Sequence, residues 1–89
     1  MSLWKRLKGY SVNEKGNLAL RGVDLVHLAA LSDRPLYVFD EVALRENLRL
    51  YKDALKLFYP KPASVFYASK AFLNLAMGSL LKQEGVGID

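Results

Sequence analysis

The sequence has no cysteine, and it has a single histidine, His27. Without thiols the chain can form neither a disulfide framework nor a thiolate zinc site, and it has no cysteine nucleophile. His27 has no second metal-ligating residue at a suitable spacing, so we interpret it as a surface or half-buried residue of a short helix. We predict that the chain binds no metal and that any nucleophile is a side chain other than cysteine.

Long hydrophobic runs are missing as well. No apolar stretch approaches the roughly 18–20 residues that a membrane-spanning helix needs. Residues 1–6 (MSLWKR) are not followed by the apolar segment of a secretory signal. The lack of cysteine is compatible with a reducing compartment. We therefore expect a cytoplasmic protein with no membrane partner.

Basic residues outnumber acidic ones, with 13 lysines and arginines against 9 aspartates and glutamates. The excess lies at the N-terminus, where Lys5, Arg6 and Lys8 precede the first acidic residue, Glu14. The remaining charges are mixed in sign, whereas a nucleic-acid-binding face usually carries a dense basic stripe interleaved with exposed aromatic residues. We interpret the N-terminus as a solvated basic arm and predict no nucleic-acid partner.

The composition favours a folded protein. Of the 89 residues, 52% are hydrophobic and 25% are charged, which excludes the composition typical of disordered chains. A chain of this length can form one small domain with a core, and it is too short for two domains.

The sequence pattern predicts alternating strands and helices. Gly16 lies in a polar turn before a short strand, and Asp24 stands where a helix N-cap belongs. The run 36–39 (LYVF) is continuously apolar, which is typical of a strand buried on both faces. The expected elements are strand 18–20, a helix from 24 to about 32, strand 36–39, helix 41–58, strand 64–68, helix 73–81 with Gly85 at its C-cap, and a strand beginning at Val86.

This order of elements predicts parallel strands joined by right-handed helical crossovers. Two and a half strand–helix units are too few to cover a parallel sheet, and a (β/α)8 barrel takes about 250 residues. We therefore predict an α/β fold: the first two to three βα units of a (β/α)8 TIM-type barrel, preceded by a short N-terminal segment with a β-strand and incomplete on its own. The expected division is an arm and strand at 1–23 and the start of the barrel at 24–89.

Lys70 is the candidate for chemistry. It follows an apolar strand, and a parallel sheet would place it at the carboxyl end of that strand, where α/β folds build their sites. Phe66, Ala68 and Phe72 around it could partly desolvate the amine and leave some of it uncharged and nucleophilic. Such an amine can form a Schiff base with an aldehyde cofactor. From its position and composition alone, Lys70 is better explained as the exit of the chain to solvent, as for most lysines that follow strands.

Four segments resemble the opening segments of diaminopimelate decarboxylases, which are alanine-racemase-like, fold-type III pyridoxal-phosphate enzymes. The resemblance covers about residues 22–89, and its most specific element is the Tyr-Ala-x-Lys-Ala pattern that ends at Ala71. The four segments are Pro35–Asp40 (PLYVFD), Leu44–Asn47 (LREN), Phe66–Ala71 (FYASKA) and Glu84–Asp89 (EGVGID).

The resemblance implies roles for three residues. Lys70 matches the family lysine that carries pyridoxal 5'-phosphate as a Schiff base and then acts in proton transfer. Asp89 matches an aspartate at the end of the third barrel strand, near that lysine. Ala68, two residues before Lys70, is expected to face the cofactor, while Tyr67 is about as well explained by core packing as by a cofactor contact.

The resemblance also implies the function of an intact protein. It would be a homodimeric decarboxylase that converts meso-diaminopimelate to L-lysine, with a strand at 18–20 paired to a C-terminal β-domain. The groups that bind the substrate, the phosphate and the pyridine nitrogen would lie after Asp89, so this chain alone is expected to be inactive. Two alternatives remain: a decarboxylase of the same fold acting on ornithine, arginine or carboxynorspermidine, and a non-catalytic α/β interaction or nucleic-acid-binding module.

Overall fold

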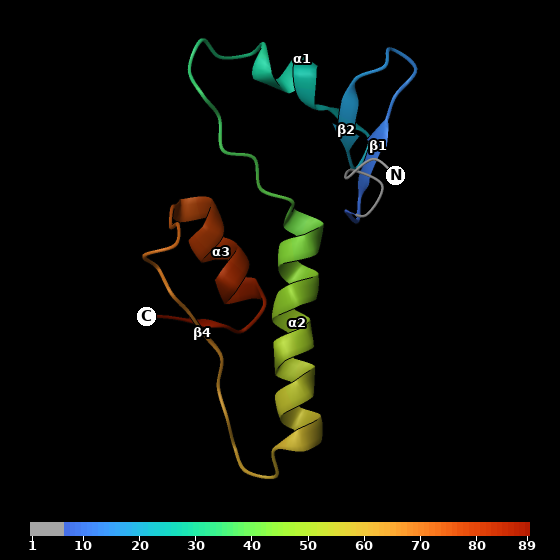
Figure 1. Cartoon of the computed structure of the whole chain (residues 1–89). Helices are drawn as coiled ribbons and strands as arrows, with labels where there is room; N and C mark the ends of the chain where they lie inside the picture. Colours follow the sequence, from blue (N-terminus) through green and yellow to red (C-terminus); the bar gives the residue numbers. More distant parts are fainter. Residues whose placement is uncertain (1–6) are drawn as a thin grey trace. The chain divides into compact units, whose positions relative to one another are not determined.

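The computed structural model describes residues 7–89 (Figure 1). The chain divides into two compact units, one ending at Phe39 and the other spanning Asp40–Asp89. Within the described residues, no helix has the length and apolar character needed to cross a membrane. Lys5 and Arg6 of the predicted basic arm lie outside this range, and Lys8 is exposed.

The first unit is built on a three-stranded antiparallel sheet in the order β1-β2-β3. The central strand supplies the buried side chains of the unit, Ala19 and Leu20. Gly16 adopts a positive φ of 78° in the turn before that strand, as predicted. The elements are β1 (Tyr10–Val12), β2 (Leu18–Leu20), β3 (Val23–Asp24) and α1 (Leu25–Ala29).

Asp24 joins this sheet to α1. One carboxylate oxygen accepts a hydrogen bond from the backbone N–H of His27 at 3.0 Å, which confirms the predicted N-cap. The other oxygen accepts hydrogen bonds from the amides of Asn17 at 3.1 Å and Asn13 at 2.8 Å. These bonds, Asn17 first, lower the pKa of Asp24 to about 2 because they favour the ionised carboxylate. His27 is exposed, in agreement with its interpretation as a surface residue.

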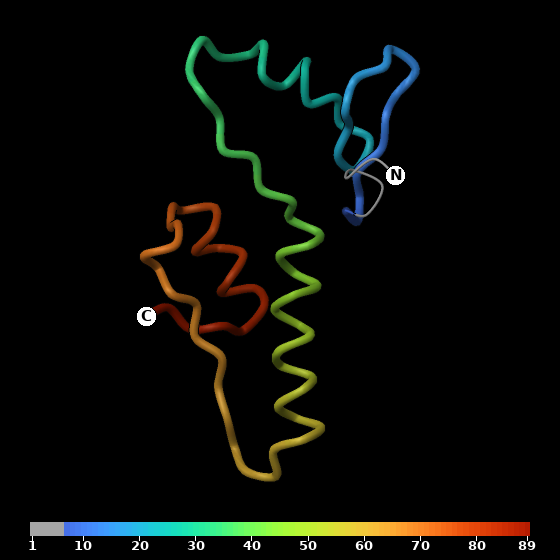
Figure 2. Tube along the Cα trace, in the orientation of Figure 1, coloured from blue at the N-terminus to red at the C-terminus, as the bar shows by residue number. Residues whose placement is uncertain are grey.

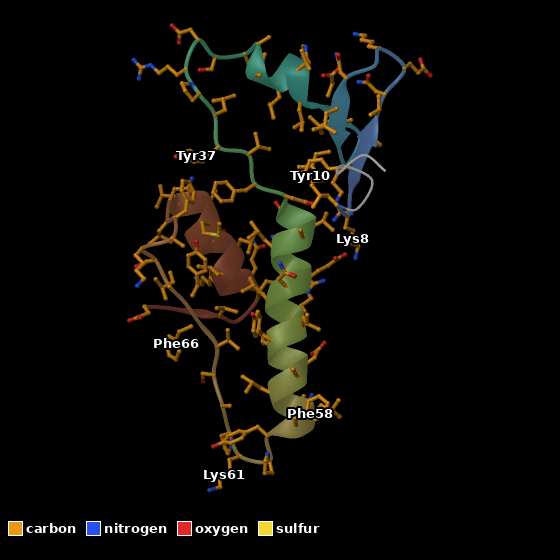
Figure 3. All side chains as sticks on the ribbon, viewed as in Figure 1. Lys8, Tyr10, Tyr37, Phe58, Lys61 and Phe66 are labelled. Carbon is orange, nitrogen blue, oxygen red and sulfur yellow. The ribbon has the colours of Figure 1, made fainter. Side chains whose placement is uncertain are left out.

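The predicted strand at 36–39 is wrong for this chain. Residues 36–39 belong to neither of the two sheets, and all four side chains are exposed, with Tyr37 90% exposed (Figure 3). A strand from the middle of a parallel sheet takes its hydrogen bonds from neighbours on both sides. Without those neighbours, an apolar run rich in β-forming residues does not by itself become a strand.

The second unit begins with α2 (Glu41–Phe58), whose bounds agree with the predicted helix. The Asp40 carboxylate accepts a hydrogen bond from the backbone N–H of Ala43 at 3.2 Å, which confirms the predicted cap. The helix ends at Tyr59, which has an extended backbone (φ −117°, ψ 114°) and precedes Pro60. Proline disfavours the helical conformation in the residue before it, so the sequence itself sets this end.

After α2 the chain forms a strand–helix–strand unit with a parallel two-stranded sheet (Figure 2). The two strands pair with Phe66 opposite Gly87 and Tyr67 opposite Ile88. Both are shorter than predicted, but their parallel pairing is confirmed. The elements are β4 (Phe66–Tyr67), α3 (Leu75–Gln83) and β5 (Gly87–Ile88).

The turn after α3 is a Schellman motif. Gly85 has a positive φ of 69°, its N–H donates to the carbonyl of Lys82 at 3.1 Å, and the N–H of Val86 donates to the carbonyl of Leu81 at 2.9 Å. Leu81 and Val86 then pack in the same apolar core. The predicted role of Gly85 at the helix C-terminus is confirmed.

The core of the second unit lies between the helices and the parallel strands. Its buried members are Met77, Leu81 and Val86, from α3 and the start of β5. Partly buried residues of α2, β4 and the loop before α3 pack against them: Leu44, Leu48, Val65, Tyr67 and Phe72. The mixed α/β class is therefore confirmed, whereas two parallel strands are too few to show a barrel.

The division into units differs from the one expected from sequence. The break falls between Phe39 and Asp40, whereas the expected boundary lies between residues 23 and 24. The reason is that β3 pairs with β2 and leads directly into α1, whose N-cap Asp24 is bonded to the β1–β2 turn. The expected boundary concerns a larger protein and stays a prediction.

Candidate cofactor site at the carboxyl ends of β4 and β5

The parallel ladder brings the ends of β4 and β5 together. The N–H of Asp89 donates to the carbonyl of Tyr67 at 2.9 Å, and the N–H of Ser69 donates to the carbonyl of Asp89 at 3.0 Å. The hydrogen-bonded ladder thus extends past both short strands as far as Ser69. Because Lys70 is the next residue, two of the predicted site residues, Lys70 and Asp89, meet at the same edge of the sheet.

Lys70 lies in a tight turn just past β4. The N–H of Ala71 donates to the carbonyl of Ala68 at 3.1 Å, which closes the turn around residues 69 and 70. The side chain of Lys70 is exposed. The expectation of a partly desolvated amine is therefore not met within the described residues.

Tyr67 faces the core. Its ring packs against the buried cluster of α3, and its hydroxyl donates to the carbonyl of Phe72 at 2.5 Å. Because side chains alternate along a strand, Phe66 and Ala68 lie on the other face of the sheet, away from the helices. Both are exposed, and Phe66 projects outward from β4 (Figure 3). Tyr67 thus has a packing role here. Ala68 is on the opposite face, and its contact with a cofactor stays a prediction.

The second strand follows the same alternation. Val86 is in the core, so Gly87 and Asp89 belong to the face that carries Phe66 and Ala68. A Cβ atom on Gly87 would lie 2.6 Å from the Phe66 ring, so the ring occupies the space where a side chain at 87 would be. The result is a bare sheet face with small residues beside the lysine turn. We call these four residues, Phe66, Ala68, Gly87 and Asp89, the open face.

A cluster of ion pairs lies at the other end of the sheet, before β5. The Glu84 carboxylate pairs with Arg45 at 2.7 Å and with Arg49 at 2.7 Å, and its side chain is only 8% exposed. Lys52 donates to the Glu84 backbone carbonyl at 2.6 Å. We call these four residues the Glu84 clamp. Arg49 and Arg45 lower the pKa of Glu84 to about 2 because they favour its charged form.

Sequence reasoning missed this clamp. The spacing of Arg45, Arg49 and Lys52 on one helix does place three cations along one side of α2. The sequence does not predict which residue pairs with them, because Glu84 is 35 residues further along the chain from Arg49. The clamp holds α2 on the Schellman turn, so it positions β5 without touching the predicted site.

Other parts of the chain offer less for catalysis. Among residues 7–89, no group of three His, Cys, Asp or Glu residues could hold a metal ion. A groove of about 530 Å³ lies near the amino end of β4, lined mainly by loop 59–65 together with Lys52 and Lys56. Lys70, Ala68 and Asp89 do not line this groove, so it is separate from the predicted site.

Comparison with known proteins supports the resemblance. The chain is 47% identical to the diaminopimelate decarboxylase of Methanothermobacter thermautotrophicus over 78 residues, which is 88% of this chain and 18% of that protein. The corresponding enzyme of Bacillus methanolicus is 45% identical, with the same coverage of both chains. The Bacillus subtilis enzyme is 40% identical over 86% of this chain and 17% of that protein. This chain is similar to diaminopimelate decarboxylases.

The similarity covers only a small part of each related enzyme. The chain spans less than a fifth of the curated diaminopimelate decarboxylases described above, which is consistent with the predicted match to one portion of such enzymes. No family model matches the chain. No solved structure matches it either.

Proposed function

We propose that the chain is a portion of a pyridoxal-phosphate-dependent decarboxylase that converts meso-diaminopimelate to L-lysine and CO2. The observation that carries this proposal is the parallel pairing that sets Ser69, the residue before Lys70, against Asp89 at the carboxyl ends of two strands. That edge is where α/β proteins place their catalytic groups. The identities of 40–47% to diaminopimelate decarboxylases support the choice of this activity.

The residues at this edge suit pyridoxal phosphate. The amine of Lys70 is exposed, so an aldehyde can reach it. Ala68, on the adjoining open face, is exposed and has only a methyl side chain, so it leaves room for a planar ring beside the lysine turn. When bound, the cofactor would supply a conjugated ring that accepts the electron pair left by the departing carboxylate.

Lys70 and Asp89 would have distinct tasks. The Lys70 amine would hold the aldehyde cofactor covalently. Lys70 would also hold and deliver a proton at Nζ. Asp89, as a carboxylate at the same edge, would orient that amine by accepting a hydrogen bond from it.

The wider architecture is proposed along with the activity. We propose that β4, α3 and β5 are part of a (β/α)8 barrel and that the intact enzyme is a cytoplasmic homodimer. Leu18–Leu20 is flanked by β1 and β3, so a C-terminal β-domain would have to pair with this sheet through β1 or β3. Substrate, phosphate and pyridine-nitrogen ligands would come from elsewhere in the enzyme, so this chain alone should release no CO2.

Selective labelling tests the site in the chain itself. The chain is incubated with pyridoxal phosphate, reduced with borohydride, and mapped by peptide mass spectrometry. We expect Lys70 to carry more adduct than Lys61, an exposed lysine of the same unit (Figure 3). Lys70→Arg keeps the charge and should abolish the selective signal, whereas Lys61→Arg should leave it unchanged. Equal labelling of both lysines would refute the assignment of Lys70.

A chimera tests the activity. The matching segment of the Bacillus subtilis enzyme, which is 40% identical, is replaced by this chain. We expect release of CO2 from meso-diaminopimelate, reduced by about 10²- to 10⁴-fold in the Lys70→Ala chimera, since a positioned acid–base group contributes that much. A folded chimera that decarboxylates ornithine or arginine instead would favour one of the related enzymes.

A further inference from the structure

The turn that carries Lys70 is tied on both sides by side-chain hydroxyls. On the β5 side, the Ser69 hydroxyl donates to the carbonyl of Asp89 at 2.5 Å. On the α3 side, the Tyr67 hydroxyl donates to the carbonyl of Phe72 at 2.5 Å. Both bonds are at the short end of the range for O–H···O hydrogen bonds. Lys70 therefore lies between two anchored residues.

Ser69 makes a double contact with one oxygen atom. Its backbone N–H donates to the Asp89 carbonyl at 3.0 Å, and its hydroxyl donates to the same oxygen. The backbone bond belongs to the parallel ladder and would form with any residue at this position except proline. The second bond depends on serine, because its donor is the side-chain hydroxyl.

We infer that Ser69 is a positioning residue, which holds the backbone of Lys70 at a fixed place relative to Asp89 through its hydroxyl bond to the Asp89 carbonyl. This inference rests on the proposed function, since it assumes that the Lys70 amine is the reacting group. Small displacements of a reacting group reduce rates strongly, so a short bond one residue away acts on reactivity without touching the cofactor. Tyr67 anchors the other end of the turn in the same way.

Three variants test the hydroxyl bonds of Ser69 and Tyr67 one at a time. Ser69→Ala removes the hydroxyl and keeps the ladder bond, and Ser69→Thr restores a hydroxyl. Tyr67→Phe removes the second anchor and keeps the ring in the core. Ser79→Ala is the matched control, because Ser79 is an exposed serine within α3.

The measurement is the ratio of adduct at Lys70 to adduct at Lys61 after treatment of the full chain with pyridoxal phosphate and borohydride. Ser69→Ala should lower this ratio by about twofold to tenfold, the range that corresponds to one hydrogen bond. Ser69→Thr should restore the ratio, and Ser79→Ala should leave it unchanged. Circular dichroism of each variant shows whether α2 and α3 are still folded.

The outcomes distinguish the two proposals. A selective chain whose ratio is unchanged in folded Ser69→Ala would overturn the role of Ser69 and leave the proposed function intact. An unselective starting chain would overturn the assignment of Lys70 and the role of Ser69 with it. If Ser69→Ala unfolds while Ser69→Thr keeps the fold and still loses selectivity, the hydroxyl is structural and the inference is wrong.

Discussion

The two units of the chain are stabilised by different kinds of interaction. In the first, three polar side chains, Asn13, Asn17 and Asp24, link a turn, a strand and a helix through hydrogen bonds. In the second, an apolar core around Leu81 is combined with the Glu84 clamp. The first unit is therefore organised by local bonds over short sequence separations, whereas the second depends on contacts between distant segments. Local sequence patterns therefore predict the bonds of the first unit better than the contacts between distant segments of the second.

The largest expected effect comes from the core of the second unit. Leu81 is 1% exposed, so Leu81→Ala should lower the free energy of unfolding of this unit by about 2–5 kcal/mol, through lost burial and a cavity. Leu75, on the same helix, is 95% exposed, so Leu75→Ala should change it by less than about 0.5 kcal/mol. Urea unfolding measures the change in free energy for both variants, and amide hydrogen exchange follows each unit separately. If Leu81→Ala lowered the protection of β2 as much as that of α3, the two units would not be independent.

Two glycines of the α3 region provide the next test, with effects of opposite sign. Gly85 has a positive φ of 69°, so Gly85→Ala should destabilise the second unit by about 1–2 kcal/mol. Gly78 lies within α3, and a Cβ there would meet nothing within 4 Å. Gly78→Ala should stabilise the unit by about 0.5–1 kcal/mol. The same urea titration measures the free energy of unfolding of both variants. If the two substitutions changed it in the same direction, the Schellman assignment would be contradicted.

Acid should affect the second unit through Glu84. Its pKa is lowered from an ordinary value of 4.5 to about 2, so the folded state binds fewer protons than the unfolded state in this window. The contribution of Glu84 to stability is therefore complete above pH 4.5 and is lost as the pH falls towards 2. Glu84→Gln should flatten the pH dependence of stability in that window, measured by urea unfolding at several pH values. An unchanged slope would show that the clamp contributes little.

The first unit should show the smallest effect, through Asp24. Its pKa is lowered from 3.8 to about 2, so its stabilising contribution is lost as the pH falls through that interval. Asn is also a good N-cap, so Asp24→Asn keeps the cap of α1 and removes the titrating charge. Hydrogen exchange of the β1–β2 amides should then lose its acid dependence. Glu14→Gln, in the exposed part of the same turn, serves as the control.

The sequence was sufficient for features that depend on local chemistry. The caps at Asp24 and Asp40, the end of α2 before Pro60 and the glycine turn at Gly85 are all set by a few neighbouring residues, and each was predicted. The parallel pairing of β4 and β5 was also predicted, because helical crossovers favour it.

The remaining features depend on partners that are distant in the chain. Residues 36–39 have the composition of a central strand but do not form one here, because they pair with no neighbouring strand. Glu84 could not be assigned to the arginines of α2 from spacing alone. Lys70 follows the carboxyl end of β4, but its exposure could not be predicted, since burial depends on what covers the edge.

The alternation along β4 also limits how this segment can change during evolution. Tyr67 faces the core while Ala68 belongs to the open face, and Lys70 lies in the tight turn that follows β4. Substitutions that keep size and polarity change one contact at a time. An insertion or deletion of one residue between Val65 and Lys70 would exchange the two faces of the strand and move the lysine out of register with Asp89. We therefore expect homologous sequences to vary in residue type here and to keep the length of this segment constant.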